Sequence, residues 1–304
     1  MSKLPTAASV TSVKRPHYLH KKAYATVEQP SRQCTVVRIE VPNKLSWEGW
    51  ILLRSDAHHD NAKCDRQLEK RHLDEAVSRN ALIFDCGDLF CAMQGKFDPR
   101  SSRSAITPEQ QGRNDYLNVL LDEATKFYSP YKNHFATLSP GNHETNILNR
   151  CGIDLTAFLA ERLEAAAMSY AGFIRLQFSR QGAGWKESKI VAYHHGHGVG
   201  GPVTRGVIGT ARRAVIWPDA DVIWSGHTHE SWTVVVPQQK LNNQNRIIRR
   251  DTLHISTPGY KDEHSIMDGW AIEKGLNPKP LGATWLRLIV HNDKIRIEAQ
   301  QALA

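Results

Sequence analysis

Residues 135–144 read FATLSPGNHE, and the pattern of this stretch recurs along the rest of the chain. The apolar run Phe135–Leu138 is typical of a buried strand, and the Pro-Gly pair after it predicts a turn. The turn presents the amide of Asn142 and the imidazole of His143 at the end of the strand. Asn and His are both common in ordinary surface turns, so this pair alone does not indicate a function. It indicates one only if the ends of other strands carry similar polar residues, and we call such a strand end a polar corner.

Four other predicted strands end in polar side chains of this kind. The apolar runs 49–54, 81–84, 189–193 and 221–224 indicate buried strands. The residues that follow them are Asp56 and His58, then Asp88, then His194, His195 and His197, and finally His227 and His229. A helix predicted at 65–79 makes the first two strands a β-α-β unit, and such units gather ligands beyond the carboxyl ends of parallel strands. The corners are therefore expected to meet at one edge.

The remaining segments complete an α/β chain. Strands are predicted at 34–41, 172–179, 231–237 and 252–256, and a hairpin at 283–291 and 294–299. Helices are predicted from the capping pattern at 107–110 and at 154–167 and 205–215. Segments 238–250 and 261–282 are predicted to be long surface loops. Residues 1–33 are predicted to be a basic, largely irregular arm that precedes a single domain at 34–304.

Composition favours a globular chain that carries a basic arm. No apolar run approaches the ~20 residues that span a bilayer, and no signal-peptide core is present, so a cytoplasmic protein without a membrane partner is expected. Five cysteines without a C-x-x-C pair indicate reduced thiols. The net charge is +8, and residues 1–45 hold eight basic side chains against two acidic ones. This arm is either an electrostatic tether for nucleic acid or a solvated leader.

The corner residues have the donor chemistry of a metal site. Carboxylate, amide and imidazole donors without thiolates suit Mn²⁺, Fe or Zn²⁺ bound near octahedrally. Two neighbouring metals need one bridging carboxylate with terminal donors on each side, and this set supplies both. Each motif alone is weak, because Asp-x-His, Gly-Asp and His-x-His all occur in ordinary loops. Five such corners in one order, each after an apolar strand, predict a dinuclear site.

The order of the motifs resembles that of the calcineurin-like metallophosphoesterase superfamily over roughly residues 50–230. The matching motifs are Asp56-x-His58, Gly87-Asp88, Gly141-Asn142-His143-Glu144, His195 and Gly226-His227-x-His229. The resemblance implies a four-layer α/β/β/α sandwich of two mixed β-sheets, the metallo-dependent phosphatase fold. It also implies a first metal on Asp56, His58 and His229, a bridging Asp88, and a second metal on Asn142, His195 and His227.

The function implied by the resemblance is hydrolysis of a phosphomonoester or phosphodiester by attack of a metal-bound hydroxide. Two divalent ions lower the pKa of a shared water and orient the phosphate; Mn²⁺ is preferred, with Fe, Zn²⁺ or Ni²⁺ as alternatives. His143 would be the catalytic residue that protonates the leaving oxygen. One alternative is a DNA or RNA nuclease of the same superfamily, and another is a non-catalytic binding scaffold on the same fold. The oligomeric state is left open.

Two sets of residues have alternative interpretations. His195 is preferred as the second-metal ligand because the ligand of the family commonly lies just before a Gly at a strand end, and His197 and then His194 are the alternatives. The candidates for contact with a substrate phosphate are Arg205, Arg212 and Arg213, which fit an ordinary basic helix face equally well.

Cys91 departs from the family pattern. Many relatives carry an Asp three residues after the bridging Asp, where it helps to orient the catalytic His. A thiol is a poor hydrogen-bond acceptor in its place. The run Gly87–Phe90 resembles the branch that contains double-strand-break repair nucleases, which place a His at this position, and this favours phosphodiester substrates. The sequence therefore leaves open which group orients His143.

Overall fold

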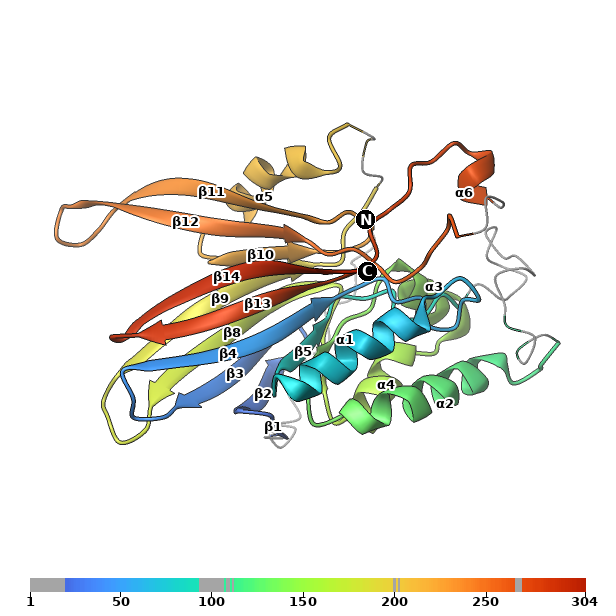
Figure 1. Cartoon of the computed structure of the whole chain (residues 1–304), viewed down its shortest axis with the longest axis horizontal. Coiled ribbons are helices and arrows are strands. Elements are labelled where there is room, and N and C mark those ends of the chain that lie inside the picture. The colour runs from blue at the N-terminus through green and yellow to red at the C-terminus, as the bar shows by residue number, and fades with distance from the viewer. Residues whose placement is uncertain are drawn as a thin grey trace, which may run out of the picture.

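Two β-sheets packed face to face form the centre of the molecule (Figure 1). The computed structural model describes residues 20–92, 107, 110, 112–198, 201, 203–265 and 270–304. Within these residues the larger sheet has eight strands, in the spatial order β1 (His20–Lys22), β2 (Ala25–Ser31), β3 (Cys34–Val41), β8 (Ala171–Arg180), β9 (Lys186–His194), β10 (Val222–Ser225), β12 (Ile247–Ser256) and β11 (Trp232–Leu241). The smaller sheet has six, in the order β14 (Lys294–Leu303), β13 (Gly282–His291), β4 (Ser46–Arg54), β5 (Leu82–Asp85), β6 (Phe135–Leu138) and β7 (Ala166–Ala167).

Both sheets are mixed. In the smaller sheet β4, β5, β6 and β7 run parallel, whereas β13 pairs antiparallel with β4 and β14. In the larger sheet β9, β10 and β12 run parallel, and the pairs β8–β9 and β11–β12 are antiparallel. The strands β4, β5, β6, β9 and β10 are the ones that end in the polar corners. Because they are parallel within each sheet, their carboxyl ends lie at a common edge.

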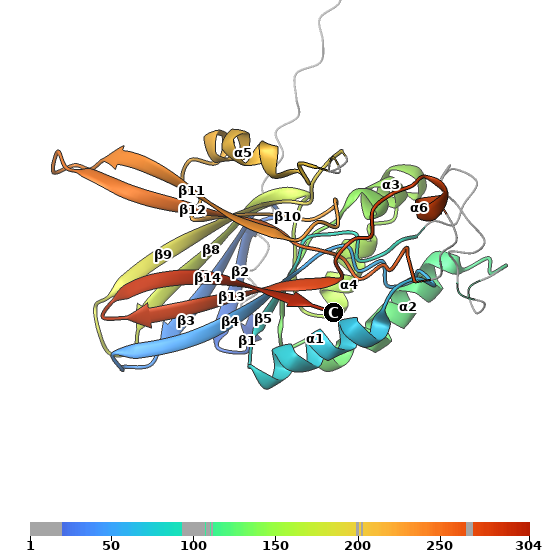
Figure 2. The same ribbon diagram turned by 45° about the horizontal axis from the view of Figure 1, so that its top comes forward.

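Helices cover the outer face of each sheet and complete four layers (Figure 2). On the smaller sheet lie α1 (Arg66–Ser78), α2 (Tyr116–Tyr128) and α4 (Leu155–Arg162), with α3 (Asn142–Cys151) beside α4. On the larger sheet lies α5 (Thr210–Ile216), which bonds to the sheet through Arg213 and Ser225, and Trp217 directly after it packs on Ala192 and Ile223. The remaining short helix is α6 (Trp270–Glu273), and 3-10 turns occur at Ser129–Tyr131 and Val207–Gly209. The α/β/β/α sandwich expected from the sequence is confirmed.

The core explains why the corner strands are continuously apolar. Successive side chains of a strand point to opposite faces, so Ile51 and Leu53 enter the space between the sheets while Leu52 packs under the helices. The same holds for β5, where Leu82 and Phe84 lie between the sheets and Ile83 lies under the helices. Both faces of these strands are buried, which is the arrangement that an unbroken apolar run indicates. Among the described residues, no helix has the length and apolar character needed to cross a membrane.

Regular structure begins earlier in the chain than predicted. Residues 20–31, predicted to be irregular, form β1 and β2, and β2 pairs antiparallel with β3. Ala25 and Val27 from β2 are buried between the sheets. Lys22 is also buried, and its ammonium donates to the carbonyl oxygens of Lys132 (2.8 Å) and Leu163 (3.1 Å). The prediction of an irregular segment is wrong here because the lysines hide the alternation; residues 1–19 lie outside the described part of the chain.

Three further predictions differ from the structure. Segment 238–250 is not a loop, because β11 and β12 continue through most of it as a projecting hairpin (Figure 1). Its strands are largely exposed on both faces, so no alternation of apolar residues marks them. The helix predicted at 154–167 ends at Arg162, since Ala166–Ala167 pair with β6. The helix predicted to start at 107–110 begins at Tyr116, and residues 108 and 109 lie outside the described residues.

A buried guanidinium joins β4 to β5 just before their polar corners. Arg54 is fully buried and donates to Asp85 Oδ2 (2.8 Å) and Glu69 Oε1 (2.7 Å). Tyr128 donates its hydroxyl hydrogen to the same Glu69 oxygen, and His59 Nδ1 lies 2.9 Å from Oε2. Buried charges of this kind are stable only when they are paired and hydrogen-bonded. The network therefore fixes the two strand ends relative to each other and to α1.

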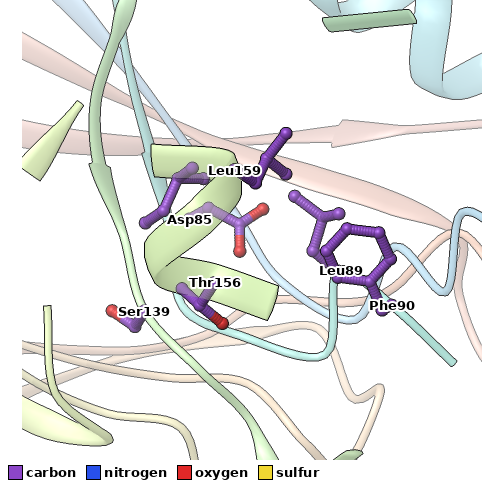
Figure 3. Close-up of a pocket in the computed structure, with 7 residues that line it drawn as sticks. Asp85, Leu89, Phe90, Ser139, Thr156 and Leu159 are labelled. Atoms are coloured by element: carbon purple, nitrogen blue, oxygen red, sulfur yellow. The ribbon is translucent and has the colours of Figure 1, made fainter. Parts of the chain in front are cut away.

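A small pocket lies beside this network on the helix-covered side of the sheet (Figure 3). It has no room for a water molecule, and its lining consists of Asp85, Leu89, Phe90, Leu138, Ser139, Thr156 and Leu159. The Asp85 carboxylate already accepts from Arg54 and from the Gly87 N–H (3.0 Å). The pocket thus belongs to the packing of α4 on the sheet, and none of the predicted metal ligands lines it.

Candidate metal centre

The polar corners of both sheets meet at one edge of the sandwich. Five of the seven predicted ligands have left-handed backbone conformations, namely Asp56 (φ 53°), His58 (46°), Asp88 (52°), His227 (70°) and His229 (53°). Such φ values are uncommon outside glycine and mark functional strain when the surroundings enforce them. Here the two corners of the smaller sheet hold each other, since the Asp56 N–H donates to Gly87 O (2.8 Å) and the His58 N–H to Asp88 O (3.0 Å).

Two glycines permit the close approach of these corners. A Cβ at Gly141 would lie 2.1 Å from Asp88 Oδ1, and one at Gly226 would lie 2.4 Å from Ser55 Oγ. Any side chain at either position would push a predicted ligand out of place. This is the physical reason for the Gly that precedes Asn142 and the Gly that precedes His227.

The first group of donors consists of Asp56, His58 and His229. One donor atom from each lies within 4.8 Å of the other two. His229 Nε2 is 3.4 Å from His58 Nε2 and 3.5 Å from Asp56 Oδ1. Asp56 Oδ1 and His58 Nδ1 are buried and have no hydrogen-bond partner among the described residues. Buried polar atoms are normally satisfied, so the chemistry of an unsatisfied carboxylate oxygen beside two imidazoles fits the binding of a cation.

The second group consists of Asp88, His195 and His227, whose donor atoms also lie within 4.8 Å of one another. His195 Nε2 is 3.2 Å from Asp88 Oδ2 and 3.3 Å from Asn142 Oδ1. The same amide oxygen is 2.8 Å from His227 Nδ1. The structure thus brings together all seven residues that the sequence singled out, in the two sets that the resemblance implies.

The other nitrogens of two imidazoles are held by main-chain carbonyls. His195 Nδ1 lies 2.7 Å from Cys86 O, and His227 Nε2 lies 2.9 Å from Gly198 O. A carbonyl only accepts, so each of these nitrogens carries a hydrogen, and the opposite nitrogen of the ring faces the site. This orientation by a backbone carbonyl is typical of metal-binding histidines.

The protonation states of the site residues are also consistent with the binding of a cation. Burial lowers the pKa of His58 and takes that of His229 to about 3, helped by the Lys261 ammonium, so both rings are neutral and able to bind a metal. Burial lowers the pKa of His195, but Asp88 raises it to about 10. The proton on His195 supplies the positive charge that a metal between these donors would supply instead. Burial raises the pKa of Asp56 to about 7, although the positive charge of His195 acts to lower it.

His143 lies between the two groups, and a main-chain carbonyl takes the place of its missing acidic partner. Its Nδ1 is 2.6 Å from Cys91 O, and its Nε2 is 3.9 Å from Asp88 Oδ2. The Cys91 carbonyl is itself fixed, because Asp60 accepts from the N–H groups of Cys91 (2.5 Å) and Ala92 (2.8 Å). The departure at Cys91 therefore changes the orienting group without removing it.

Two positioning residues escaped the sequence reasoning. Glu144 accepts from the N–H groups of Gly141 (2.8 Å), Asp88 (3.1 Å) and Phe90 (2.8 Å), so it ties the second corner to the third. Its place three residues after Gly141 is the capping-box signal that could have indicated this role. Asp60, which holds Cys91, carries no such signal, because its partners are thirty residues away in the chain.

The structure separates the three candidate histidines. His195 is fully buried and faces Asp88, whereas His197 is exposed. His194 is half-buried beside Tyr170 and Trp217, and its Nδ1 accepts from the Gly196 N–H (2.9 Å). This geometry favours His195 as the ligand.

The candidate arginines are not joined to the metal ligands by any hydrogen bond or ion pair seen in the described part of the chain. Arg213 donates to Ser225 Oγ (2.9 Å) from the outer side of the larger sheet. Arg205 and Arg212 are exposed. Their contact with substrate stays a prediction.

Comparisons with known proteins yield similarity of structure only. No protein-family model matches the chain, and no curated protein matches it. A solved protein of Streptococcus pneumoniae described as a predicted phosphoesterase is 12% identical, with a TM-score of 0.30 over 85% of this chain and 99% of that one. Vps29 of Entamoeba histolytica, solved with zinc, is 11% identical, with a TM-score of 0.33 over 83% and 98%. GAP50 of Plasmodium, described as the anchor in the inner membrane complex, is 10% identical, with a TM-score of 0.40 over 84% of each chain.

Proposed function

We propose that the chain is a metal-dependent phosphoric ester hydrolase with two divalent ions at the meeting edge of its sheets. Asp56, His58 and His229 would hold the first ion, and Asn142, His195 and His227 the second, with Asp88 between them. The observation that supports this most is the pair of compact donor groups, each with a carboxylate and two imidazoles. Two such ions would supply the Lewis-acid charge that activates a water and offsets the charge of a phosphate.

The donor set favours a hard or borderline ion. All seven ligands offer oxygen or nitrogen, which suits Mn²⁺ and also admits Fe, Zn²⁺ or Ni²⁺. Four of the seven side chains are buried, while Asn142, His227 and His229 are half-buried. The four buried ligands are thus surrounded by protein. The three half-buried ligands lie on the side from which a substrate phosphate can approach.

His143 would act as the general acid. With Nδ1 donating to the Cys91 carbonyl, the opposite nitrogen of the ring is left to carry the transferable proton. The His143 N–H donates to Asp88 Oδ1 (2.9 Å), so the backbone of the acid is fixed to the bridging carboxylate. A ring fixed at both its side chain and its main chain can give a proton to the leaving oxygen without reorientation.

A lysine near the first donor group supports an anionic substrate. The segment from Gly259 to Lys261 packs on this group, since a Cβ at Gly259 would lie 3.0 Å from His229 Nδ1. The Lys261 ammonium pairs with Glu263, which also accepts from Lys63 (3.1 Å). Positive charge at the rim raises the local concentration of phosphate esters. Lys261 is therefore an additional candidate for contact with the substrate.

The experiment that tests this proposal is a hydrolysis panel with the full chain loaded with Mn²⁺. p-Nitrophenyl phosphate, bis-p-nitrophenyl phosphate, single-stranded DNA and duplex DNA are compared with and without chelator. We expect metal-dependent release of product from at least one ester, and cleavage of DNA alone would favour the nuclease alternative. If metal binds and none of the four is hydrolysed, the chain is a binding scaffold and the proposal is wrong.

A further inference from the structure

We propose that Cys91, His58 and His143 form an additional binding position for thiophilic metal ions such as Cd²⁺ or Zn²⁺, which overlaps the first donor group at His58. One ring nitrogen of each histidine and the Sγ of Cys91 all lie within 4.8 Å of one another. All three residues are buried. Two imidazoles and a thiolate are donors that select soft and borderline ions.

Two observations beyond the thiol itself indicate a ligand here. The Nδ1 of His58 is buried without a hydrogen-bond partner among the described residues, although its ring packs edge-on against that of His143 with centroids 4.9 Å apart. The Cys91 sulfur is oriented before any metal arrives, because it accepts from Asn61 Nδ2 (3.1 Å) while Asp60 holds the backbone of the same residue. The cluster thus combines an unsatisfied imidazole, a second imidazole and a fixed sulfur.

A metal ion bound at this position would interfere with the proposed reaction. His58 is shared with the first donor group, and His143 is the proposed general acid. A soft ion bound here would release to solvent the thiol proton of Cys91 and the transferable proton of His143. It would then form one bond to the Cys91 sulfur and one to the freed lone pair of His143. It would therefore inhibit turnover even while the remaining donors keep their places. A carboxylate at position 91 would give no such preference for soft ions, so the sensitivity is a consequence of this particular cysteine.

The test is a titration of the chain with Cd²⁺ followed by the ultraviolet charge-transfer absorption of the cadmium–thiolate bond. The variants are Cys91→Ser and the matched control Cys64→Ser, since Cys64 lies in another His-Cys-Glu cluster with His59 and Glu69. We expect the band in the wild type and in the Cys64→Ser variant, and its loss in Cys91→Ser. Cys91→Ala, checked by circular dichroism for folding, serves as a second variant and should also lack the band.

Two results would overturn the inference: a wild type without the band, or a Cys91→Ser variant that keeps it in full. This readout does not depend on hydrolysis, so it separates failure of the cysteine site from failure of the proposed function. If the chain hydrolyses an ester with Mn²⁺, the Cd²⁺ concentration for half-inhibition should rise about tenfold or more in Cys91→Ser. Equal inhibition of both proteins would place the inhibitory ion on the seven proposed ligands instead.

Discussion

The His143→Ala variant is expected to lose turnover by about 10²–10⁴-fold, which is the usual contribution of a positioned general acid. The imidazole is held by the Cys91 carbonyl at Nδ1, and its other nitrogen is 3.9 Å from Asp88 Oδ2. Removing it takes away one ring neighbour of His58 but leaves the contacts that join the donors within each group. The measurement is kcat for the ester that the hydrolysis panel identifies.

The metal content of the His143→Ala variant shows whether His143 is the general acid or a metal ligand. We expect bound Mn²⁺, measured by mass spectrometry of the dialysed protein, to stay near the wild-type level in His143→Ala. His291→Ala is the matched control, since His291 is exposed at the end of β13 and should retain full turnover. If metal and activity disappear together, His143 is a ligand and not the acid. Unchanged turnover in His143→Ala would remove the residue from the mechanism altogether.

The Arg54→Met variant is expected to lower the free energy of unfolding by about 3–5 kcal/mol, the cost of breaking a buried ion pair from one side. Arg54, Asp85 and Glu69 are all buried, and the guanidinium donates to both carboxylates. Its aromatic neighbours add to the loss, since its centre lies 5.1 Å from the Tyr128 ring and 5.5 Å from that of Tyr260. Without the guanidinium, Asp85 keeps only the Gly87 N–H, and Glu69 keeps only Tyr128 and His59.

Urea unfolding measures this effect, with Arg287→Met as control. Arg287 pairs with Glu48 at the surface and is 30% exposed, so its replacement should cost at most about 1 kcal/mol. The midpoint in urea should fall in Arg54→Met while the slope of the transition stays constant. A loss below about 1 kcal/mol for Arg54→Met would contradict the role given to the network.

The polar corners could be predicted because they depend on short-range signals. Strands β4, β5 and β10 are buried on both faces, and a strand of that kind is an unbroken apolar run that ends where polar residues begin. The antiparallel hairpin of β13 and β14 is marked by the polar turn at 292–293. The amino-terminal start of α1 is marked by Asp65, which accepts from the Leu68 N–H (2.9 Å).

The parts that could not be predicted depend on contacts between distant residues. β2 gains its order from pairing with β3, and β1 from pairing with β2. The projecting hairpin of β11 and β12 is stabilised by its own ladder, while the side chains near its tip are largely exposed. The carbonyl that orients His143 has no side-chain signature, and the carboxylate of Asp60 that fixes it lies thirty-one residues before Cys91. Short-range sequence patterns predict the donor residues, whereas the contacts that hold those residues in place are seen only in the structure.

The most direct test of the account is the number of divalent ions bound per chain in the wild type and in Asp88→Asn. Equilibrium dialysis against Mn²⁺, followed by metal analysis, gives this number without reference to any substrate. We expect two ions in the wild type. We expect weaker binding of both in Asp88→Asn, because the side chain proposed to lie between the two ions loses its charge. A wild type that binds no ion or one, or an Asp88→Asn variant that binds two as tightly, would contradict the account.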